Sequence, residues 1–294
     1  MTEVLSVVVK LSALVFVVGS MMAMGLSLTI PQITKPLKDA KLLVLALIAN
    51  FVLVPILAYV ITLTFPSIFG GFSKDNTIAF LLLATAAGAP FLPKLAQMAR
   101  GNIAYSVGLM TLLMVVTIVY LPIVLPLLLP GVEVNPWDIA QGLIVTMLIP
   151  LGIGLFIRAR YEDTATHLQP TFGQAANTAL MIMLGVLLVM NIKTILGVVG
   201  TGVLLAGVVF YLGSFVIGFL LGFGAEQGTK SVLGLGTGQR NLSAAFVVAA
   251  SNFSDRPDVL ITLVVLTVVD LFIMLPLGGE IGKRVAAATG KAES

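Results

Sequence analysis

Three charged side chains lie deep inside strongly apolar stretches of this chain: Lys94, Arg240 and Asp270. A charge at the centre of a membrane helix costs about 2.5–3.5 kcal/mol on insertion scales, so such residues are candidate sites for ions or polar ligands. Arg240 and Asp270 lie near the centres of neighbouring stretches, and a salt bridge between them would neutralise both. A buried pair that only joins two helices is the competing interpretation.

Lys94 follows Pro93, and proline suits the first turn of a helix. The lysine would then lie at a helix N-terminus, where the helix dipole already favours an anion. Cation and dipole together predict an anionic ligand. Two alternatives stay open: a lysine deprotonated by burial, and one whose side chain extends along its helix to the membrane surface.

Both cations belong to breaks in otherwise apolar runs. Residues 88–94 read Gly-Ala-Pro-Phe-Leu-Pro-Lys, and residues 234–241 read Gly-Leu-Gly-Thr-Gly-Gln-Arg-Asn. Interrupted helices at membrane depth are tolerated only where they line a cavity or are buried in protein. The two breaks therefore indicate a binding site, with packing kinks as the alternative because Gly and Pro are common in membrane helices.

Uncharged polar residues could complete this site. For Ser106 and Thr111 we favour hydrogen bonds to their own helix, whereas Asn50 and Asn241 suit either ligand binding or helix joining. The candidate substrate-binding residues are Lys94, Arg240, Asn241, Gln239, Asn50 and Asp270. With no cysteine, and with the single His167 in a short charged loop, the sequence predicts no metal centre and no cofactor. No nucleophile–base pair is found, so we expect no enzyme.

Composition predicts the class of protein that positions these residues. Of 294 residues, 59% are hydrophobic and 10% are charged, and the mean hydropathy is +1.12. Such a chain is an all-α integral membrane protein, and its net charge of +3 reflects basic residues at span ends rather than a nucleic-acid partner. With about 20 residues per span, nine spans are expected, at 4–30, 42–65, 76–98, 103–129, 139–157, 172–192, 200–224, 229–252 and 257–282.

The breaks fall in the third and eighth of these spans. Because the number of spans from one to the other is odd, the two spans cross the membrane in opposite directions. One unit of about 4–129 and a second of about 172–282, joined by a linking span at 139–157, would form an inverted repeat within a single transmembrane domain, 1–294. In such repeats, discontinuous helices meet near the membrane midplane and form the binding site.

Basic residues predict the orientation, because cytoplasmic loops carry more Lys and Arg. With the N-terminus outside, ten lie in inward segments and three in outward loops. The inward residues are Lys35, Lys38, Lys41, Arg100, Arg158, Arg160, Lys230, Lys283, Arg284 and Lys291, and the outward residues are Lys74, Lys193 and Arg256. The C-terminus is then cytoplasmic, and the short loops favour a prokaryotic inner membrane.

Four segments resemble the bile acid:sodium symporter family: residues 24–28, 50–55, 99–102 and 148–155. Their order and spacing agree over essentially the whole chain, in the family's nine-span form. The resemblance implies a panel domain and a core domain, with two crossed, discontinuous helices in the core. It also implies sodium-driven uptake of organic anions, such as bile acids or smaller carboxylates, across a lipid bilayer.

Similar transporters bind two sodium ions through a Ser-Asn pair at the first crossing and a Glu-x-Gly-x-Gln-Asn run at the second. Here the Ser-Asn positions are Leu92 and Pro93, the acid is Gly236 and the glutamine is Arg240. Gly238 and Asn241 match. Sodium needs several oxygen ligands, and most of that shell is absent.

Other positions implied by the resemblance are also altered. An expected glutamine in the second span is Asn50, and of two expected hydroxyls in the fourth span Ser106 matches whereas the other falls on Met110. The residues that remain as a degenerate ion site are Ser106, Thr111, Gly236, Thr237 and Gly238.

We therefore expect alternating-access transport of an organic anion in which Lys94 and Arg240 replace the charge of sodium. Whether sodium is used stays open, because unwound backbone can also coordinate it. A conventional sodium symporter is thus the alternative within transport. A membrane receptor or scaffold that binds without translocating is the alternative from another class.

Overall fold

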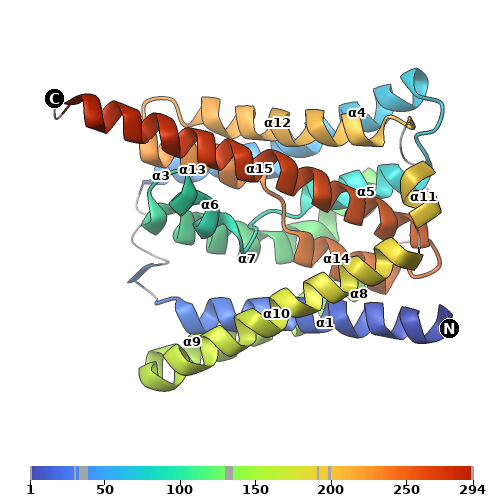
Figure 1. The fold of residues 1–294 in the computed structure, drawn as a ribbon, viewed down its shortest axis with the longest axis horizontal. Coiled ribbons are helices and arrows are strands. Elements are labelled where there is room, and N and C mark those ends of the chain that lie inside the picture. The colour runs from blue at the N-terminus through green and yellow to red at the C-terminus, as the bar shows by residue number, and fades with distance from the viewer. Residues whose placement is uncertain are drawn as a thin grey trace.

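The computed structural model describes residues 2–29, 31–32, 39–129, 135–190, 192–197 and 200–292, and within these ranges it is helical without a β-strand (Figure 1). The helices are α1 (Thr2–Ser27), α3 (Ala40–Ile48), the π-helical η2 (Ala49–Leu53), α4 (Val54–Ile68), α5 (Lys74–Thr85), α6 (Leu92–Met98), α7 (Ile103–Leu128), α8 (Pro136–Leu143), the π-helical η3 (Ile144–Leu148), α9 (Ile149–Arg160), α10 (Glu162–Met190), α11 (Ile192–Gly197), α12 (Val203–Leu221), α13 (Gln227–Gly238), α14 (Leu242–Asn252) and α15 (Pro257–Ala292).

Within the described ranges, six helical segments are long and apolar enough to cross a membrane, which fits the expected integral membrane protein. They are Val7–Ser27, Ala40–Ile68, Ile103–Leu128, Pro136–Arg160, Val203–Leu221 and Pro257–Ala287. The residues of the three other expected spans overlap with α5 and α6, with α10, and with α13 and α14, which are not among these six segments. The two ends of the chain lie at opposite ends of the molecule's long axis (Figure 1).

Both sequence breaks are interruptions of helix. After Thr85 the backbone is extended at Ala86, and Gly88 has φ of +81°, a left-handed conformation that glycine adopts without a Cβ penalty. α6 then begins at Leu92. At the second break, α13 ends at Gly238, Gln239 is extended, and the Asn241 side chain caps α14 by accepting from the Ala244 N–H at 3.1 Å.

The helices α1, α9 and α10 pack on one another along one edge of the molecule (Figure 1). Gly25 of α1 and Gly154 of α9 allow this approach. A Cβ on Gly154 would lie 2.8 Å from the Met22 carbonyl oxygen and 2.9 Å from the Gly25 Cα. Small residues that bring two backbones together are typical of helix pairs in membranes.

Gly154→Ala is therefore expected to lower the free energy of unfolding by about 1–3 kcal/mol, because the added methyl meets backbone atoms that cannot move aside. Gly152, two residues earlier on the same helix, supplies the control, since a Cβ added there would have no atom within 4 Å. Gly152→Ala is expected to raise or preserve the thermal midpoint in detergent. Equal midpoints for the two variants would contradict the close α1–α9 contact.

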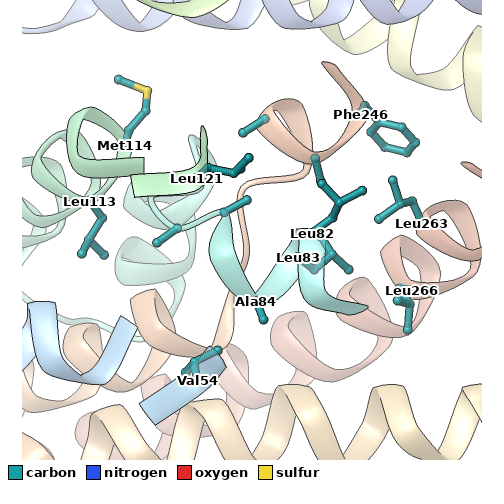
Figure 2. Close-up of a cluster of buried hydrophobic side chains, with 14 of the residues drawn as sticks. Val54, Leu82, Leu83, Ala84, Leu113, Met114, Leu121, Phe246, Leu263 and Leu266 are labelled. Carbon is teal, nitrogen blue, oxygen red and sulfur yellow. The ribbon is translucent and has the colours of Figure 1, made fainter. Parts of the chain in front are cut away.

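The C-terminal end of α5 lies at the centre of the other helices. Figure 2 shows Leu82, Leu83 and Ala84 of α5 among side chains from α4, α7, α14 and α15. These residues are fully buried. The first break therefore emerges inside the protein, where each exposed backbone group needs a partner.

Candidate functional site

The two helix breaks meet directly. The Asn241 N–H donates to the Ala86 carbonyl at 2.9 Å, and its side-chain amide donates to the carbonyls of Ala87 at 3.3 Å and Gly88 at 3.1 Å. The Thr117 hydroxyl of α7 accepts from the Ala87 N–H at 2.9 Å and donates to the Ala87 carbonyl at 3.0 Å. The second break and α7 thus satisfy the backbone of the first.

Arg240 is only 1% exposed, although it is the largest fully buried side chain among the described residues. Its Nε donates to the Leu83 carbonyl at 3.0 Å, and its Nη2 donates to the Ala84 carbonyl at 2.8 Å. These two carbonyls lie at the C-terminus of α5, where unpaired carbonyls carry partial negative charge. The guanidinium therefore caps α5 from the second break.

The third guanidinium nitrogen extends this network to the second expected span. Arg240 Nη1 donates to Asn50 Oδ1 at 2.8 Å and to the Thr237 carbonyl at 3.2 Å. Asn50 in turn donates to Thr237 Oγ1 at 3.2 Å and to the Ala46 carbonyl at 3.0 Å. Asn50 belongs to η2, and a short π-helical turn inside an α-helix is frequent at functional sites.

The salt bridge considered between Arg240 and Asp270 is not formed. Among the described residues the ion pairs are Arg158–Glu162, Arg256–Asp75 and Arg284–Glu280. The reason is that each guanidinium nitrogen of Arg240 already donates to a carbonyl or amide oxygen. Asp270 is 2% exposed, and its Oδ1 has no hydrogen-bond partner.

Lys94 lies in a different environment from Arg240. Its side chain is exposed at the protein surface, and Nζ donates to Gln97 Oε1 at 3.2 Å along α6. The structure therefore does not join the two cations in one buried group. This contact agrees with the alternative in which the lysine side chain extends along its own helix.

Several buried polar atoms near the second break have no hydrogen-bond partner. They include Gln239 Oε1 and Ser243 Oγ at the break, and the hydroxyls of Tyr211 and Ser214 on α12. Buried polar atoms are normally paired, so unpaired ones call for an explanation such as a ligand or water. By contrast, Ser106 and Thr111 donate to carbonyls of their own helix at 2.6 Å and 2.9 Å, which confirms that expectation.

The sequence model of the "Sodium Bile acid symporter family" matches residues 13–198 of the chain. The chain belongs to this family. The match includes Asn50 and Lys94 and ends before Arg240 and Asp270. The second break is therefore characterised by its geometry and not by the match.

Two relatives carry the name "Probable sodium/metabolite cotransporter BASS3, chloroplastic". The protein from Arabidopsis thaliana is 22% identical over 237 residues, which are 79% of this chain and 54% of the relative. The protein from Oryza sativa subsp. japonica is 23% identical over 202 residues, which are 68% of this chain and 47% of the relative. This family member thus spans about half the length of the curated relatives. Family and relatives are named as transporters, which supports the expectation that the chain is not an enzyme.

In this family member two of the positions implied as sodium ligands, Leu92 and Gly236, lie against apolar side chains. Leu92 is buried, and its Cδ2 lies 2.8 Å from where a Cβ on Gly236 would be. Leu109 Cδ2 lies 3.1 Å from the same point. Methyl groups therefore fill the space into which an acid at position 236 would extend, and the residues do not fit a sodium ion there.

Three buried hydroxyl residues of the site could not be identified from the sequence: Thr117, Tyr211 and Ser214. A lone hydroxyl in an apolar stretch most often bonds only its own helix, so nothing in its type or spacing indicated a role. Thr117 could have been found only by knowing that the unwound backbone at Ala87 crosses α7.

Proposed function

We propose that this chain is a secondary transporter of organic anions that works by alternating access and needs no sodium. The observation that carries the proposal is the buried Arg240 guanidinium at the point where the two helix breaks meet. A fixed cation there supplies the positive charge that a bound sodium ion would otherwise bring.

The architecture that we propose has nine spans in an inverted repeat. α5 with α6 and α13 with α14 are its two discontinuous helices, and their breaks are joined by the hydrogen bond from Asn241 to Ala86 at 2.9 Å. The α1, α9 and α10 group belongs to the panel domain, and the breaks belong to the core domain. Movement of one domain against the other would expose the breaks to each side in turn.

We also propose the orientation inferred from the basic residues, with the N-terminus outside and a cytoplasmic C-terminus in a prokaryotic inner membrane. Lys35 and Lys38, which contribute to that count, lie outside the described residues. Termini on opposite sides agree with the positions of the two chain ends in Figure 1.

Two observations support sodium independence. Leu92 and Gly236, in place of the implied serine and glutamate, bring no side-chain oxygen to the crossing. Arg240, in place of the implied glutamine, makes four hydrogen bonds that hold the crossing together without an ion. A sodium ion beside this guanidinium would also be repelled by a like charge in a medium of low dielectric.

An organic anion is the substrate class that this charge favours, and both bile-acid-like molecules and small carboxylates belong to it. The unpaired Gln239 Oε1 and Ser243 Oγ lie beside the guanidinium in sequence. The serine hydroxyl can donate to a carboxylate, whereas the unpaired glutamine oxygen only accepts, so Gln239 would contact the anion through its amide nitrogen. The names of the relatives favour a second candidate, sodium-coupled cotransport of a metabolite.

Transport of radiolabelled carboxylates by purified protein in proteoliposomes tests the proposal. With cholate and succinate as probes, vesicles loaded with unlabelled probe are expected to take up label by exchange at the same initial rate in sodium and in choline buffer. Sodium stimulation of tenfold, equivalent to about 1.4 kcal/mol, would support the cotransporter. Saturable binding without exchange of any probe would indicate a receptor.

A further inference from the structure

We propose that Asp270 is a proton-binding site and that the transporter couples substrate movement to the proton bound there. This inference rests on the proposed function and adds its coupling ion. It gives Asp270 a role in proton binding instead of the direct substrate contact expected from the sequence.

Asp270 lies in the interior of the helix core. The residue is only 2% exposed, and its carboxylate oxygen Oδ1 has no hydrogen-bond partner. Its neighbours on α15, Leu266 and Val269, pack against Gly207 of α12. A Cβ added to Gly207 would lie 2.9 Å from Leu266 Cδ2 and 3.3 Å from Val269 Cγ1. An ionised carboxylate without partners in such surroundings is strongly unfavourable. In this conformation the carboxyl group therefore holds a proton.

The one buried cation nearby does not remove this requirement. Met274, one turn after Asp270, contacts Gly238, since a Cβ there would lie 2.7 Å from the methionine Cε. Asp270 and Arg240 are thus close enough to interact electrostatically. Yet the guanidinium donates to the end of α5, to Asn50 and to Thr237, and makes no ion pair with the acid.

Few titratable groups face Asp270. Tyr211 of α12 and Arg240 after α13 lie within electrostatic range. α14 carries no titratable residue, and the charged residues of α5, Lys74 and Asp75, occupy its first turn. The other titratable residues on helices packed against α15 are Lys94 on α6, Glu162, Asp163 and His167 on α10, Lys193 on α11 and Lys230 on α13. Of the charged residues named, Arg240 is thus the one within electrostatic range of Asp270.

The coupling step is a single proton transfer. When the crossing opens to water on one side, the carboxyl O–H bond breaks, the proton goes to that water, and the electron pair stays on the carboxylate. The carboxylate then pairs with Arg240 and neutralises the charge that attracts the substrate. Reprotonation from the other side releases Arg240, so one proton accompanies one monovalent anion and no net charge moves.

Proteoliposomes with an imposed pH gradient test this coupling, with cholate as the probe. A gradient of about one pH unit, acidic outside, is expected to drive about tenfold accumulation by the wild type. Asp270→Asn, which cannot release a proton, is expected to accumulate no label under the gradient but to retain exchange without one. Asp255→Asn, at an exposed acid in the loop before α15, should behave as the wild type.

The outcomes separate this inference from the proposed function. If the wild type exchanges label but the pH gradient does not change its accumulation, proton coupling is overturned and anion transport is retained. A gradient response that persists in Asp270→Asn overturns the assignment to Asp270. Absence of exchange in the wild type with cholate and with succinate overturns the proposed function, and proton coupling with it.

Infrared difference spectroscopy gives a second test that does not depend on the folding of the variant. Purified wild-type protein with isotopically labelled aspartate is expected to show the carbonyl band of a protonated carboxylic acid at neutral pH, because exposed aspartates are ionised there. The band should disappear as the pH rises. A wild-type spectrum with no protonated aspartate at neutral pH would overturn the proposal.

Discussion

Replacing Arg240 with glutamine is expected to lower the free energy of unfolding by about 3 kcal/mol or more and to abolish exchange of carboxylates. The loss leaves the Ala84 carbonyl and Asn50 Oδ1 without their Arg240 donors in the protein interior, and each buried unpaired acceptor costs about 1–3 kcal/mol. The Leu83 carbonyl loses one of its two donors and keeps the Ala86 N–H at 3.2 Å. The shorter amide cannot reach the end of α5 and Asn50 together. A large fall in the thermal midpoint in detergent is the measurement.

Two further variants separate charge from structure at this position. Arg240→Lys keeps the cation but cannot reproduce a guanidinium that donates from three nitrogens, so we expect intermediate stability. Arg160→Gln removes an exposed arginine and should change the midpoint little. Wild-type stability in Arg240→Gln would show that the hydrogen bonds to α5 do not hold the crossing together.

Gly88→Ala is the other substitution with a large expected effect. The residue has φ of +81°, and a Cβ there would overlap the Met114 backbone nitrogen and lie 2.7 Å from the Met110 carbonyl oxygen. A left-handed conformation costs an alanine about 1–2 kcal/mol. The contact with the α7 backbone adds about 1–3 kcal/mol of overpacking, because neither backbone segment can move aside. We therefore expect poor folding yield and a strongly lowered thermal midpoint.

A second glycine separates these two costs. Gly200 has φ of +93°, but a Cβ added there would have no atom within 4 Å. Gly200→Ala should therefore lose only the conformational part, about 1–2 kcal/mol. Equal midpoints for Gly88→Ala and Gly200→Ala would contradict the close contact between the first break and α7.

The apolar stretches and the two breaks could be read from the sequence because both depend on local composition. Each expected span contains a described helix or helix pair, and the helices stop where glycine and proline cluster at residues 86–91 and near Gly238. The burial of Arg240 and Asn241 followed from the cost of polar groups at membrane depth. These features need no knowledge of tertiary contacts.

The partners of the buried charges could not be read in the same way. The sequence offered Asp270 as a partner for Arg240 without deciding whether the two pair, whereas the guanidinium donates to the carbonyl groups of Leu83 and Ala84. Any residue type can supply a backbone carbonyl, so the sequence does not indicate which carbonyls accept these hydrogen bonds. The position of Lys94 was undetermined for a related reason, since a long flexible side chain can extend in several directions.

Sodium binding to the purified protein tests the central claim most directly, namely that Arg240 occupies the electrostatic role of a bound cation at the crossing. Binding of radioactive sodium can be measured by scintillation proximity, with Leu92→Ser combined with Gly236→Glu and Arg240→Gln as a variant that restores three of the implied ligands. The account predicts no saturable sodium binding to the wild type. Saturable binding that cold sodium displaces and choline does not would contradict it.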